Sequence, residues 1–501
     1  MEHLLDQLGR ALAHLPGQPH AQLLFQGVLF FVVFTAVYAL YTLLGKTKAR
    51  VYILLGFSLY FYYKFSGWFV FLLIGTGGLG WLLGQAIART RHQGRRDLYK
   101  YTAIALSLGL LAYFKYTNFF VQSYWSLANP GEAAPLYDIL LPIGISYYTF
   151  RGISYILEVH GGEPAEPNPA HYLCYLSFFP SMLAGPISRQ DELLPALRQP
   201  YTLSRVQMGT AFFLFIKGLF KKVVIADYLA ENFVNRIFGN PGQYSGLENL
   251  MATYAFGFQL YADFSGYIDM ALGIALLLGF ELRPNFNEPF KAGNISEFWR
   301  RWHMTLSSWF NDYVFVPLSF AWRRWRRLGT VLAVLLTFFL SGLWHGPHWG
   351  YVLWGSSHGL IIALEVAGAG LRRRIRTAMP HGLYRLLSIL LTYQVLAFTY
   401  ILFQAAVLGK DLAYIGLMYD KILTQVDYSL LGDFVSAYRW VVVVLLLAVV
   451  LHFLPCRYKE AVRTAFVRCH WLLQGVIIAL AVVLIYQVKS AALLPFVYLQ
   501  F

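Results

Sequence analysis

Charged side chains are scarce in this sequence. Asp, Glu, Lys and Arg make up 13% of its 501 residues, whereas a soluble globular domain averages about 25%. Hydrophobic residues reach 58%, and apolar runs near membrane length recur from Gln22 to Lys489. A large soluble core would not need such repeated runs. The chain is therefore predicted to be an all-α, polytopic membrane protein.

Cysteine is rarer still. Cys174, Cys456 and Cys469 are the only three in the sequence, and their spacing fits neither a disulfide framework nor a thiolate zinc site. His345 and His348 lack the i, i+4 spacing and the carboxylate of a zinc helix. A glycine-rich phosphate loop is also missing. The sequence therefore predicts no metal site and no tightly bound cofactor.

Acidic residues are few compared with basic ones, 25 against 40, which gives a net charge of +15. A balance of this kind can indicate nucleic-acid binding, but here the charges lie in short loops between apolar runs, as in cytoplasmic loops of membrane proteins. Membrane lipids are therefore expected as partners, and nucleic acid is not. One topology agrees with the charges of all the loops. It is a multi-pass protein with the arginine-rich loops in the cytoplasm and both termini outside.

The apolar pattern predicts about 11 to 12 transmembrane helices. Residues 1–21 are expected to form an amphipathic interfacial helix instead. Residues 171–187 are broken by proline and glycine, and residues 293–320 mix aromatic residues with arginines. Both segments are predicted to be re-entrant or interfacial, because irregular backbone at membrane depth must be enclosed by protein. The predicted crossings lie near residues 22–44, 51–63, 67–88, 101–125, 139–158, 207–229, 248–280, 329–345, 349–368, 386–407, 438–455 and 471–489.

Polar and amphipathic residues concentrate in one region of this apolar chain, residues 294–358. Ionisable side chains at membrane depth are costly, so they usually face a cavity, a partner or a reaction. The region is therefore the predicted functional centre. Its notable residues are Trp299, Arg300, Arg301, Trp302, His303, Trp309, Asn311, Asp312, Trp344, His345, Gly346, His348, Trp354 and His358.

Several stretches here resemble the membrane-bound O-acyltransferase (MBOAT) family, in its bacterial branch that modifies polysaccharides. The alginate O-acetylation type is the closer match, and the teichoic acid D-alanyl transfer type the less close. A lone WHG tripeptide would be weak, but WHG preceded by NISEFWRRWH at this distance is highly specific. The matching stretches follow the family's order at residues 141–159, 178–189, 217–227, 258–282, 285–318 and 342–346.

The resemblance implies a fold and a site. The fold is a bowl-like helical bundle with a central tunnel that runs from the cytoplasm to an outer funnel. The active-site histidines of the family map onto His303 and His345, which are expected to face one another across this tunnel, and His358 matches a further histidine. The implied organisation is an interfacial helix (1–21), N-terminal transmembrane helices (22–130), a catalytic core (131–368) that includes both irregular segments, and C-terminal transmembrane helices (369–501).

The implied activity is transfer of an acyl group from a thioester to a hydroxyl in a bacterial plasma membrane. The expected donor is cytosolic acetyl-coenzyme A, as a substrate. The expected acceptor is an exported polysaccharide, or a serine of an extracytoplasmic partner protein that acetylates the polymer. D-alanyl transfer from a carrier protein is the alternative with the same chemistry. A transporter or channel with a histidine-lined pathway is the alternative of another class.

The chemistry assigns roles to the histidines. A hydroxyl that attacks a thioester must lose its proton, and histidine suits this task because its pKa lies near neutrality. His345 is the leading candidate for the general base. His303 would orient the acceptor or the thioester, or stabilise the developing oxyanion. Exchanged roles and a transient acyl-His345 remain open alternatives, and His358 is expected to support the site.

Other residues are assigned supporting or tunnel-lining roles. Trp302 and Trp344 adjoin the histidines and are therefore candidates for lining the tunnel. The alternative is helix packing, which is the commoner role of tryptophan in membranes. Asn311 and Asp312 are expected to complete a polar network around residues 293–320.

Two carboxylates lie within a predicted crossing. Asp263 and Asp269 are six residues apart and therefore lie on different helical faces. Each is expected to partner an arginine, such as Arg300 or Arg301, or to face the cavity. The arginines at residues 323–327 are explained by topology, with binding of coenzyme A phosphates as the alternative.

Overall fold

The computed structural model describes residues 23–488, which contain helices and connecting loops but no strand. The predicted all-α class is confirmed. The described residues form two compact units, 23–211 with 270–283 and 212–269 with 284–488. The amphipathic helix expected at residues 1–21 lies outside the described residues. The division at residues 130 and 368 that the resemblance implies stays a prediction.

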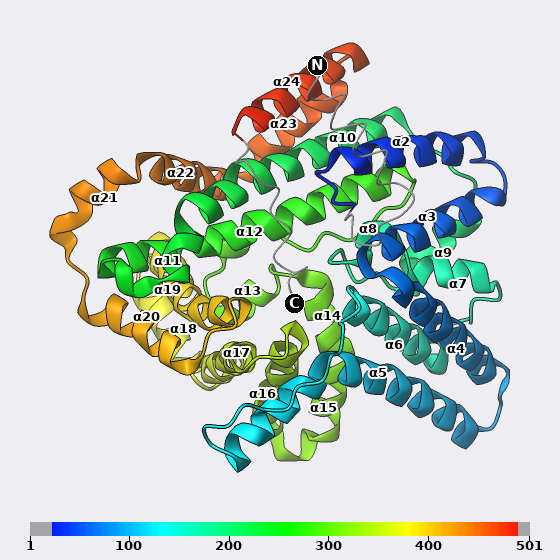
Figure 1. The fold of residues 1–501 in the computed structure, drawn as a ribbon, viewed down its shortest axis with the longest axis horizontal. Coiled ribbons are helices and arrows are strands. Elements are labelled where there is room, and N and C mark those ends of the chain that lie inside the picture. Colours follow the sequence, from blue (N-terminus) through cyan, green and yellow to red (C-terminus); the bar gives the residue numbers. More distant parts are fainter. Residues whose placement is uncertain (1–22, 489–501) are drawn as a thin grey trace. The chain divides into compact units, whose positions relative to one another are not determined.

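Long helices dominate the first unit, and α4, α5 and α6 lie side by side in it (Figure 1). The crossings expected at residues 51–63 and 67–88 are one helical run of 41 residues, Ala49–Arg89. The sequence break at Gly67 produces only a short 3-10 turn. The elements are α2 (Val28–Leu43), α3 (Ala49–Ser66), η1 (Gly67–Phe69), α4 (Val70–Arg89), α5 (Gln93–Ala128), α6 (Ile145–Gly161), α7 (Pro169–Leu176), α8 (Phe179–Met182) and α9 (Gln190–Arg198).

The segment at residues 171–187 is irregular, as predicted: α7 and the one-turn α8 are separated by loops, and its backbone after Met182 is not helical. Four of its carbonyl groups accept hydrogen bonds from one fully buried side chain, Arg151 of α6. The guanidinium donates to the carbonyls of Tyr175, Leu176, Ser181 and Pro186 and to the Ser181 hydroxyl. A planar group with five donors suits this task, so an arginine in a predicted crossing stabilises a broken backbone.

The second unit contains an antiparallel helical hairpin, α16 (Arg326–His345) and α17 (Trp349–Ala367). The two helices approach closely at Gly342 and Gly355. A Cβ atom added at Gly342 would lie 2.4 Å from the Tyr351 carbonyl oxygen, and one at Gly355 would lie 2.4 Å from that of Phe338. Small residues at helix crossings permit such close packing in membranes. The hairpin places His345 at its tip.

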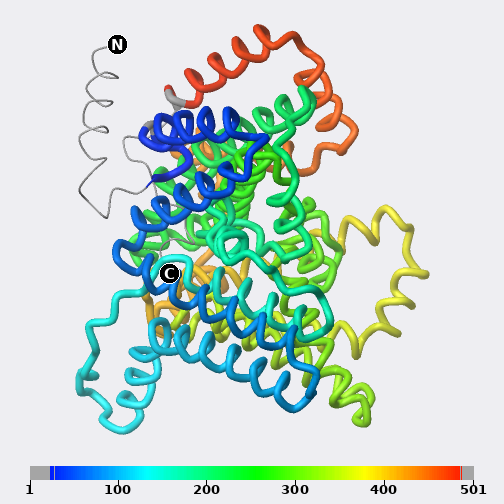
Figure 2. Tube along the Cα trace, turned by 90° about the vertical axis from the view of Figure 1, so that its right-hand side faces the viewer, coloured from blue at the N-terminus to red at the C-terminus, as the bar shows by residue number. Residues whose placement is uncertain are grey.

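The remaining elements of the second unit precede or follow this hairpin in the chain. Helix α18 turns by 67° away from α17, and Figure 2 shows this part of the chain as the yellow loop at the right. The elements are η3 (Ala230–Val234), α11 (Asn235–Gly239), η4 (Pro241–Gln243), η5 (Pro289–Lys291), α13 (Ile295–Trp299), α14 (Met304–Phe310), η6 (Asn311–Phe315), α15 (Val316–Ala321), η7 (Arg323–Trp325), α18 (Ala369–Ala378), α19 (His381–Val407), α20 (Leu412–Thr424), η8 (Tyr428–Leu430), α21 (Leu431–Ala437), α22 (Arg439–Phe453), α23 (Cys456–Arg468) and α24 (Trp471–Val488).

Two helical stretches reach from one unit into the other along the chain. They are α10 (Arg205–Phe220), continued by the π-helical η2 (Lys221–Asp227), and α12 (Gly246–Leu277). By length and composition, the described residues contain five helices able to cross a membrane, or seven if each of two bent pairs is one span. The predicted apolar membrane helices are thus confirmed. The larger count of 11 to 12 and the orientation of the termini stay predictions.

Candidate active site

His303 lies between two short helices in an unusual backbone conformation. Helix α13 begins after Asn294, whose side-chain oxygen accepts the Glu297 N–H at 2.8 Å, the usual role of an N-cap asparagine. Helix α14 begins after His303, which has a φ of 43° and a fully buried side chain. A left-handed backbone is uncommon for residues other than glycine. The chain therefore changes direction at the histidine itself.

His345 is the last residue of α16, and its side chain is 3% exposed. Aromatic rings surround it. The centroid distances from its imidazole are 4.9 Å to Trp354, 5.1 Å to Trp344 and 5.6 Å to Phe403. Edge-to-face contacts of this kind fix the orientation of a ring. The imidazole is therefore held inside the protein, away from bulk water.

The structure brings His303 and His345 into one aromatic cluster. The Trp344 ring contacts both imidazoles, with centroid distances of 6.1 Å to His303 and 5.1 Å to His345. Phe264 of α12 packs edge-to-face on His303 at 4.8 Å. The two histidines are 42 positions apart in the sequence, so their proximity to one tryptophan is a result of the fold. Their catalytic roles stay predictions.

His358 connects three helices. Its Nδ1 accepts the indole N–H of Trp299 at 3.2 Å, and its Nε2 lies 3.1 Å from the Thr399 hydroxyl. An indole N–H can only donate, so Nδ1 is the acceptor and the ring proton belongs on Nε2. His358 of α17 therefore ties α13 to α19. This geometry fits the supporting role predicted for His358.

Glu365, two turns further along α17, holds the other end of α13. Its carboxylate accepts the backbone N–H groups of Ile295 and Ser296 at 2.7 and 3.1 Å, and the Ser296 hydroxyl at 2.6 Å. The first N–H groups of a helix need such an acceptor. Sequence reasoning missed Glu365, because its target lies about 70 positions earlier in the chain.

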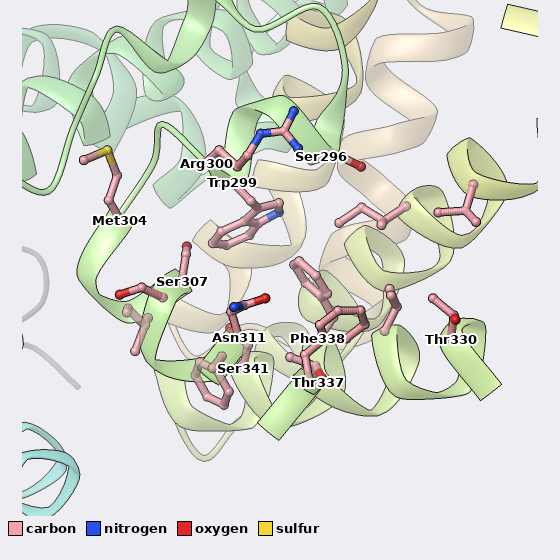
Figure 3. Close-up of a pocket in the computed structure, with 17 residues that line it drawn as sticks. Ser296, Trp299, Arg300, Met304, Ser307, Asn311, Thr330, Thr337, Phe338 and Ser341 are labelled. Atoms are coloured by element: carbon pink, nitrogen blue, oxygen red, sulfur yellow. The ribbon is translucent and has the colours of Figure 1, made fainter. Parts of the chain in front are cut away.

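An elongated cavity of about 690 Å³ adjoins the cluster (Figure 3). From Thr330 to Ser341 its wall follows one face of α16, a distance of about 16 Å at 1.5 Å per residue. Ser341 is one turn before His345. Trp299, Asn311 and Phe338 point into the same space from three elements. The lining residues are Ser296, Trp299, Arg300, Met304, Leu306, Ser307, Ser308, Phe310, Asn311, Phe315, Thr330, Val334, Thr337, Phe338, Ser341, Ile362 and Val366.

Comparison with known proteins gives the family. The model of the family described as "MBOAT, membrane-bound O-acyltransferase family" matches residues 90–404, more than half of the chain. The chain is a membrane-bound O-acyltransferase. The resemblance noted from the histidine motifs is thereby confirmed, as are the acyltransferase class and the character of a multi-pass membrane protein.

Relatives of this O-acyltransferase include proteins named for O-acetylation and for D-alanyl transfer. "Probable alginate O-acetylase AlgI" of Azotobacter vinelandii is 35% identical over 353 residues, which are 69% of each chain. The peptidoglycan O-acetyltransferase of Helicobacter pylori is 32% identical over 375 residues, 70% of this chain and 69% of the relative. The teichoic acid D-alanyltransferase of Bacillus subtilis is 29% identical over 302 residues, 57% of this chain and 74% of the relative.

The predicted supporting residues of the O-acyltransferase lie in different places. Arg300 and Asn311 line the cavity, and the Asn311 amide donates to Asp312 at 2.8 Å. Trp302 does not line the cavity. It is buried among aromatic rings, with Phe286 and Phe298 at centroid distances of 5.0 and 5.4 Å. Trp299 lines the cavity, although from the sequence helix packing is favoured for it and tunnel lining stays open only for Trp302 and Trp344.

The arginine partners expected for Asp263 and Asp269 are wrong. Asp263 pairs with Lys222 at 2.7 Å, and Asp269 pairs with Lys217 at 2.9 Å and with Lys221 at 2.7 Å. Arg301 pairs instead with Glu297. The prediction that the two aspartates lie on different faces of α12 agrees with their separate lysine partners.

Lys222 also pairs with Asp227 at 2.7 Å, so one buried ammonium lies between two buried carboxylates. The helices approach closely here, since a Cβ atom at Gly266 would lie 2.8 Å from the Gly218 carbonyl oxygen. Sequence reasoning assigned no role to Lys222 or Asp227. The sequence feature that could have pointed to this cluster is the presence of three lysines within one predicted crossing, residues 207–229.

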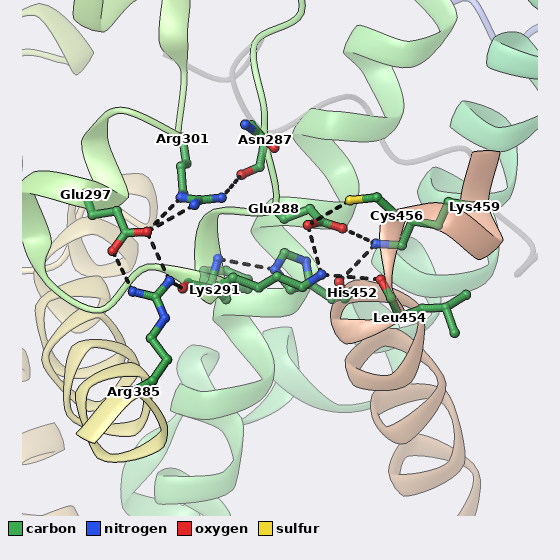
Figure 4. A network of polar contacts seen from close by, with 11 residues as sticks. Asn287, Glu288, Lys291, Glu297, Arg301, Arg385, His452, Leu454, Cys456 and Lys459 are labelled. Atoms are coloured by element: carbon green, nitrogen blue, oxygen red, sulfur yellow. Dashed lines mark hydrogen bonds and ion pairs between the residues drawn. The ribbon is translucent and has the colours of Figure 1, made fainter. Parts of the chain in front are cut away.

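A strap, residues 285–303, carries His303 and is tied to distant helices (Figure 4). Glu297 pairs with Arg385 of α19 at 3.0 Å, and Glu288 pairs with Lys459 of α23 at 2.5 Å. Both partners come from helices that follow the cavity-forming hairpin in the chain. The strap is therefore fixed by long-range ion pairs at two points.

These ion pairs predict a pH dependence of stability. Burial alone would raise the Glu297 pKa, but the hydrogen bonds from Arg385 and the Gly293 N–H outweigh it and lower the pKa to about 2. The unfolded chain would titrate near its ordinary value of 4.5. The contribution is therefore complete above pH 4.5 and is lost as pH falls towards 2. Thermal unfolding in detergent should show the midpoint falling across this window.

The Glu297→Gln variant should be less stable than the wild type at pH 7, and its midpoint should change less between pH 4.5 and 2. Glu460 provides a matched control, because it is 60% exposed and its ion pair is with Arg463 one turn away. Glu460→Gln should keep the wild-type profile. An unchanged profile in Glu297→Gln would contradict the assignment.

Proposed function

We propose that this O-acyltransferase moves an acetyl group from cytosolic acetyl-coenzyme A across the membrane centre. The acceptor is a hydroxyl of an exported polysaccharide, or a serine of an extracytoplasmic partner that acetylates the polymer. The observation that carries the proposal is the elongated cavity whose inner end lies one turn from buried His345. The relatives named as O-acetylating enzymes, at 35% and 32% identity, support acetyl over D-alanyl.

The cavity suits the pantetheine arm of a thioester donor. Its walls combine aromatic and aliphatic side chains with hydroxyl and amide groups, which match an arm that alternates methylene and amide groups. One end lies near the start of α16, which follows the arginines of residues 323–327, and near the end of α17, which precedes the arginines of α18. Two basic segments far apart in sequence thus flank one end of the cavity. Positive charge there favours a donor with phosphates.

The chemistry moves one proton in two transfers, from the hydroxyl to the histidine and then to the leaving thiolate, and needs no redox partner. The acceptor oxygen forms a bond to the thioester carbonyl carbon while His345 takes the hydroxyl proton. The C–S bond then breaks, and the thiolate that leaves receives that proton. His303 orients the acceptor or donates to the oxyanion of the tetrahedral intermediate. The products are an ester and free coenzyme A, and the aromatic cluster keeps water from competing as the nucleophile.

The test uses purified protein in lipid nanodiscs with radiolabelled acetyl-coenzyme A. Alginate oligosaccharides and peptidoglycan fragments serve as acceptors, with and without the membrane-stripped envelope fraction as a source of partner protein. We expect label in an ester-linked product. A parallel reaction supplies radiolabelled D-alanyl carrier protein as the donor, and label transferred only in that reaction would move the assignment to D-alanyl transfer. Solute flux without thioester turnover would favour the transporter alternative.

Arg300 gives a prediction about donor binding. It is exposed at the cavity, and no ion-pair partner is found for it among residues 23–488. We expect Arg300→Ala to raise the KM for acetyl-coenzyme A roughly tenfold with little change in kcat, because a contact to phosphate holds the ground state and the transition state equally. Steady-state kinetics with acetyl-coenzyme A measure this split.

Acetyl-pantetheine lacks the phosphates and should show the same KM with both proteins. Arg463→Ala is the matched control, because Arg463 pairs with Glu460 on α23. It should leave the KM for both donors unchanged. Equal increases for acetyl-coenzyme A and acetyl-pantetheine in Arg300→Ala would show that Arg300 shapes the cavity and does not bind phosphate.

A further inference from the structure

The backbone of His303 needs support from its neighbours. Its φ of 43° is in the left-handed region, which residues other than glycine adopt uncommonly, histidine more often than most, and which surrounding contacts must stabilise. The imidazole contacts Phe264 and Trp344 in this conformation. A return of the backbone to the ordinary right-handed region would rotate the imidazole away from these rings. Whatever fixes this conformation therefore fixes the position of the imidazole.

Asn285 makes the contacts that fix it. Its backbone carbonyl oxygen accepts the Met304 N–H at 2.9 Å, directly after His303. Its side-chain Oδ1 accepts the Thr305 N–H at 3.1 Å and the Thr305 hydroxyl at 2.6 Å. A second bond between the same two segments runs from the Asn287 N–H to the Arg301 carbonyl oxygen at 2.9 Å. The segments on both sides of His303 are thus held by residues 285–287.

The identity of the side chain is determined by these bonds. A backbone N–H can only donate, so the atom that faces Thr305 must be the oxygen of the amide. Asn285 is 0% exposed, and its Nδ2 has no hydrogen-bond partner among the residues that the structure describes. Within the described protein, replacing Asn285 by leucine therefore removes only the two contacts of Oδ1 to Thr305.

We propose that Asn285 is a positioning residue for the reaction: it holds the left-handed turn at His303 and so aims the imidazole at the acyl-transfer centre. This inference rests on the proposed function. The residue acts through His303 and is not assigned a contact with the donor or the acceptor. Its loss should therefore lower kcat, with little effect on the KM for acetyl-coenzyme A.

The experiment compares kcat and KM of wild type, Asn285→Leu, Thr305→Val and Thr305→Ser in nanodiscs. A misplaced catalytic group costs on the order of 10²-fold in rate, which is the loss in kcat expected for Asn285→Leu. Thr305→Val keeps its backbone N–H and loses only the hydroxyl contact, so a loss of roughly fivefold is expected. Thr305→Ser restores the hydroxyl and should restore kcat.

Asn249→Leu is the matched control. Asn249 is also 0% exposed, and its amide donates to the carbonyls of Pro241, Tyr244 and Ser245 near the start of α12. This variant should lose thermal stability but keep the kcat of the folded protein. If Asn285→Leu does not fold, the Thr305→Val and Thr305→Ser pair decides the question through its loss and rescue of kcat.

The outcomes separate this inference from the proposed function. If the wild type turns over acetyl-coenzyme A and His303→Ala does not, an unchanged kcat in Asn285→Leu or in Thr305→Val overturns the positioning role and leaves the function intact. A parallel rise in KM would also overturn it, because Asn285 would then shape the donor site. Absence of turnover in the wild type itself would overturn the proposed function.

Discussion

His345→Ala is expected to lower kcat for acyl transfer by roughly 10²- to 10⁴-fold, the usual contribution of a general base. The imidazole lies at the tip of the α16–α17 hairpin, 3% exposed and enclosed by Trp344, Trp354 and Phe403. Neither tryptophan nor phenylalanine can take a proton, so these neighbours cannot replace it. The KM for acetyl-coenzyme A should change little, because the proton moves only in the transition state.

His345→Gln tests the base role more sharply, because glutamine forms hydrogen bonds but takes no proton near neutral pH. It should be about as inactive as His345→Ala. His348→Ser is the matched control: His348 accepts the Gly350 N–H at the start of α17, and serine can keep this capping bond. It should retain kcat. Substantial activity in His345→Gln would move the base role to His303.

The two histidines could be found from sequence because each lies in a rare local pattern, FWRRWH and LWHG, within a chain that is otherwise apolar. Helical character was also predictable, since apolar runs of membrane length leave few alternatives in lipid. The same local reasoning located the irregular segment at residues 171–187, because Pro180, Gly185 and Pro186 fall close together there and disfavour a continuous helix. These features depend on residues that are close together in the chain.

The contacts that hold the site were not predictable, because they join residues far apart in sequence. Glu365 reaches α13 across about 70 positions, and Arg385 reaches Glu297 across 88. From the sequence, Asp263 and Asp269 are each expected to pair with an arginine of the functional region or to face the cavity. The actual partners are lysines of α10 and η2. Whether the two aspartates pair with arginines or with lysines is decided by the packing of η2 on α12.

The left-handed conformation of His303 was likewise invisible in the sequence. No glycine or asparagine occupies the position to suggest it, and the tripeptide that contains it, WHM, has no turn signal. The conformation depends on Asn285, which lies 18 positions earlier. The sequence motif therefore gave the identity of the residue, and tertiary contacts gave its geometry.

Lys222→Met should have the largest effect on stability. The Lys222 ammonium lies 2.7 Å from a carboxylate oxygen of Asp227 and 2.7 Å from one of Asp263, and all three residues are buried. Removing one partner of a buried ion pair leaves an uncompensated charge and typically costs about 3–5 kcal/mol. Methionine keeps the length of the side chain without its charge, so packing changes little. The free energy of unfolding in mixed micelles, measured by SDS titration, should fall by this amount.

Lys217→Met is the matched control on the same helical stretch. Lys217 is 38% exposed, and its partner Asp269 also pairs with Lys221. Its removal therefore leaves Asp269 paired, and the loss should stay within the range of about 0–1 kcal/mol that exposed pairs contribute. A loss equal to that of Lys222→Met would show that burial does not decide the effect.

A triple variant tests whether charge is the cause. Lys222→Met combined with Asp227→Asn and Asp263→Asn has no buried charge left in this cluster and should recover much of the lost stability, because a buried pair replaced as a whole is often close to neutral. If the triple variant is as unstable as Lys222→Met, the lysine acts through packing and not through its charge.

The lysine–aspartate cluster is also linked to the site, since Asp263 precedes Phe264, whose ring packs on His303 at 4.8 Å. Loss of the lysine should therefore lower acyl transfer as well, and the triple variant should restore both quantities together.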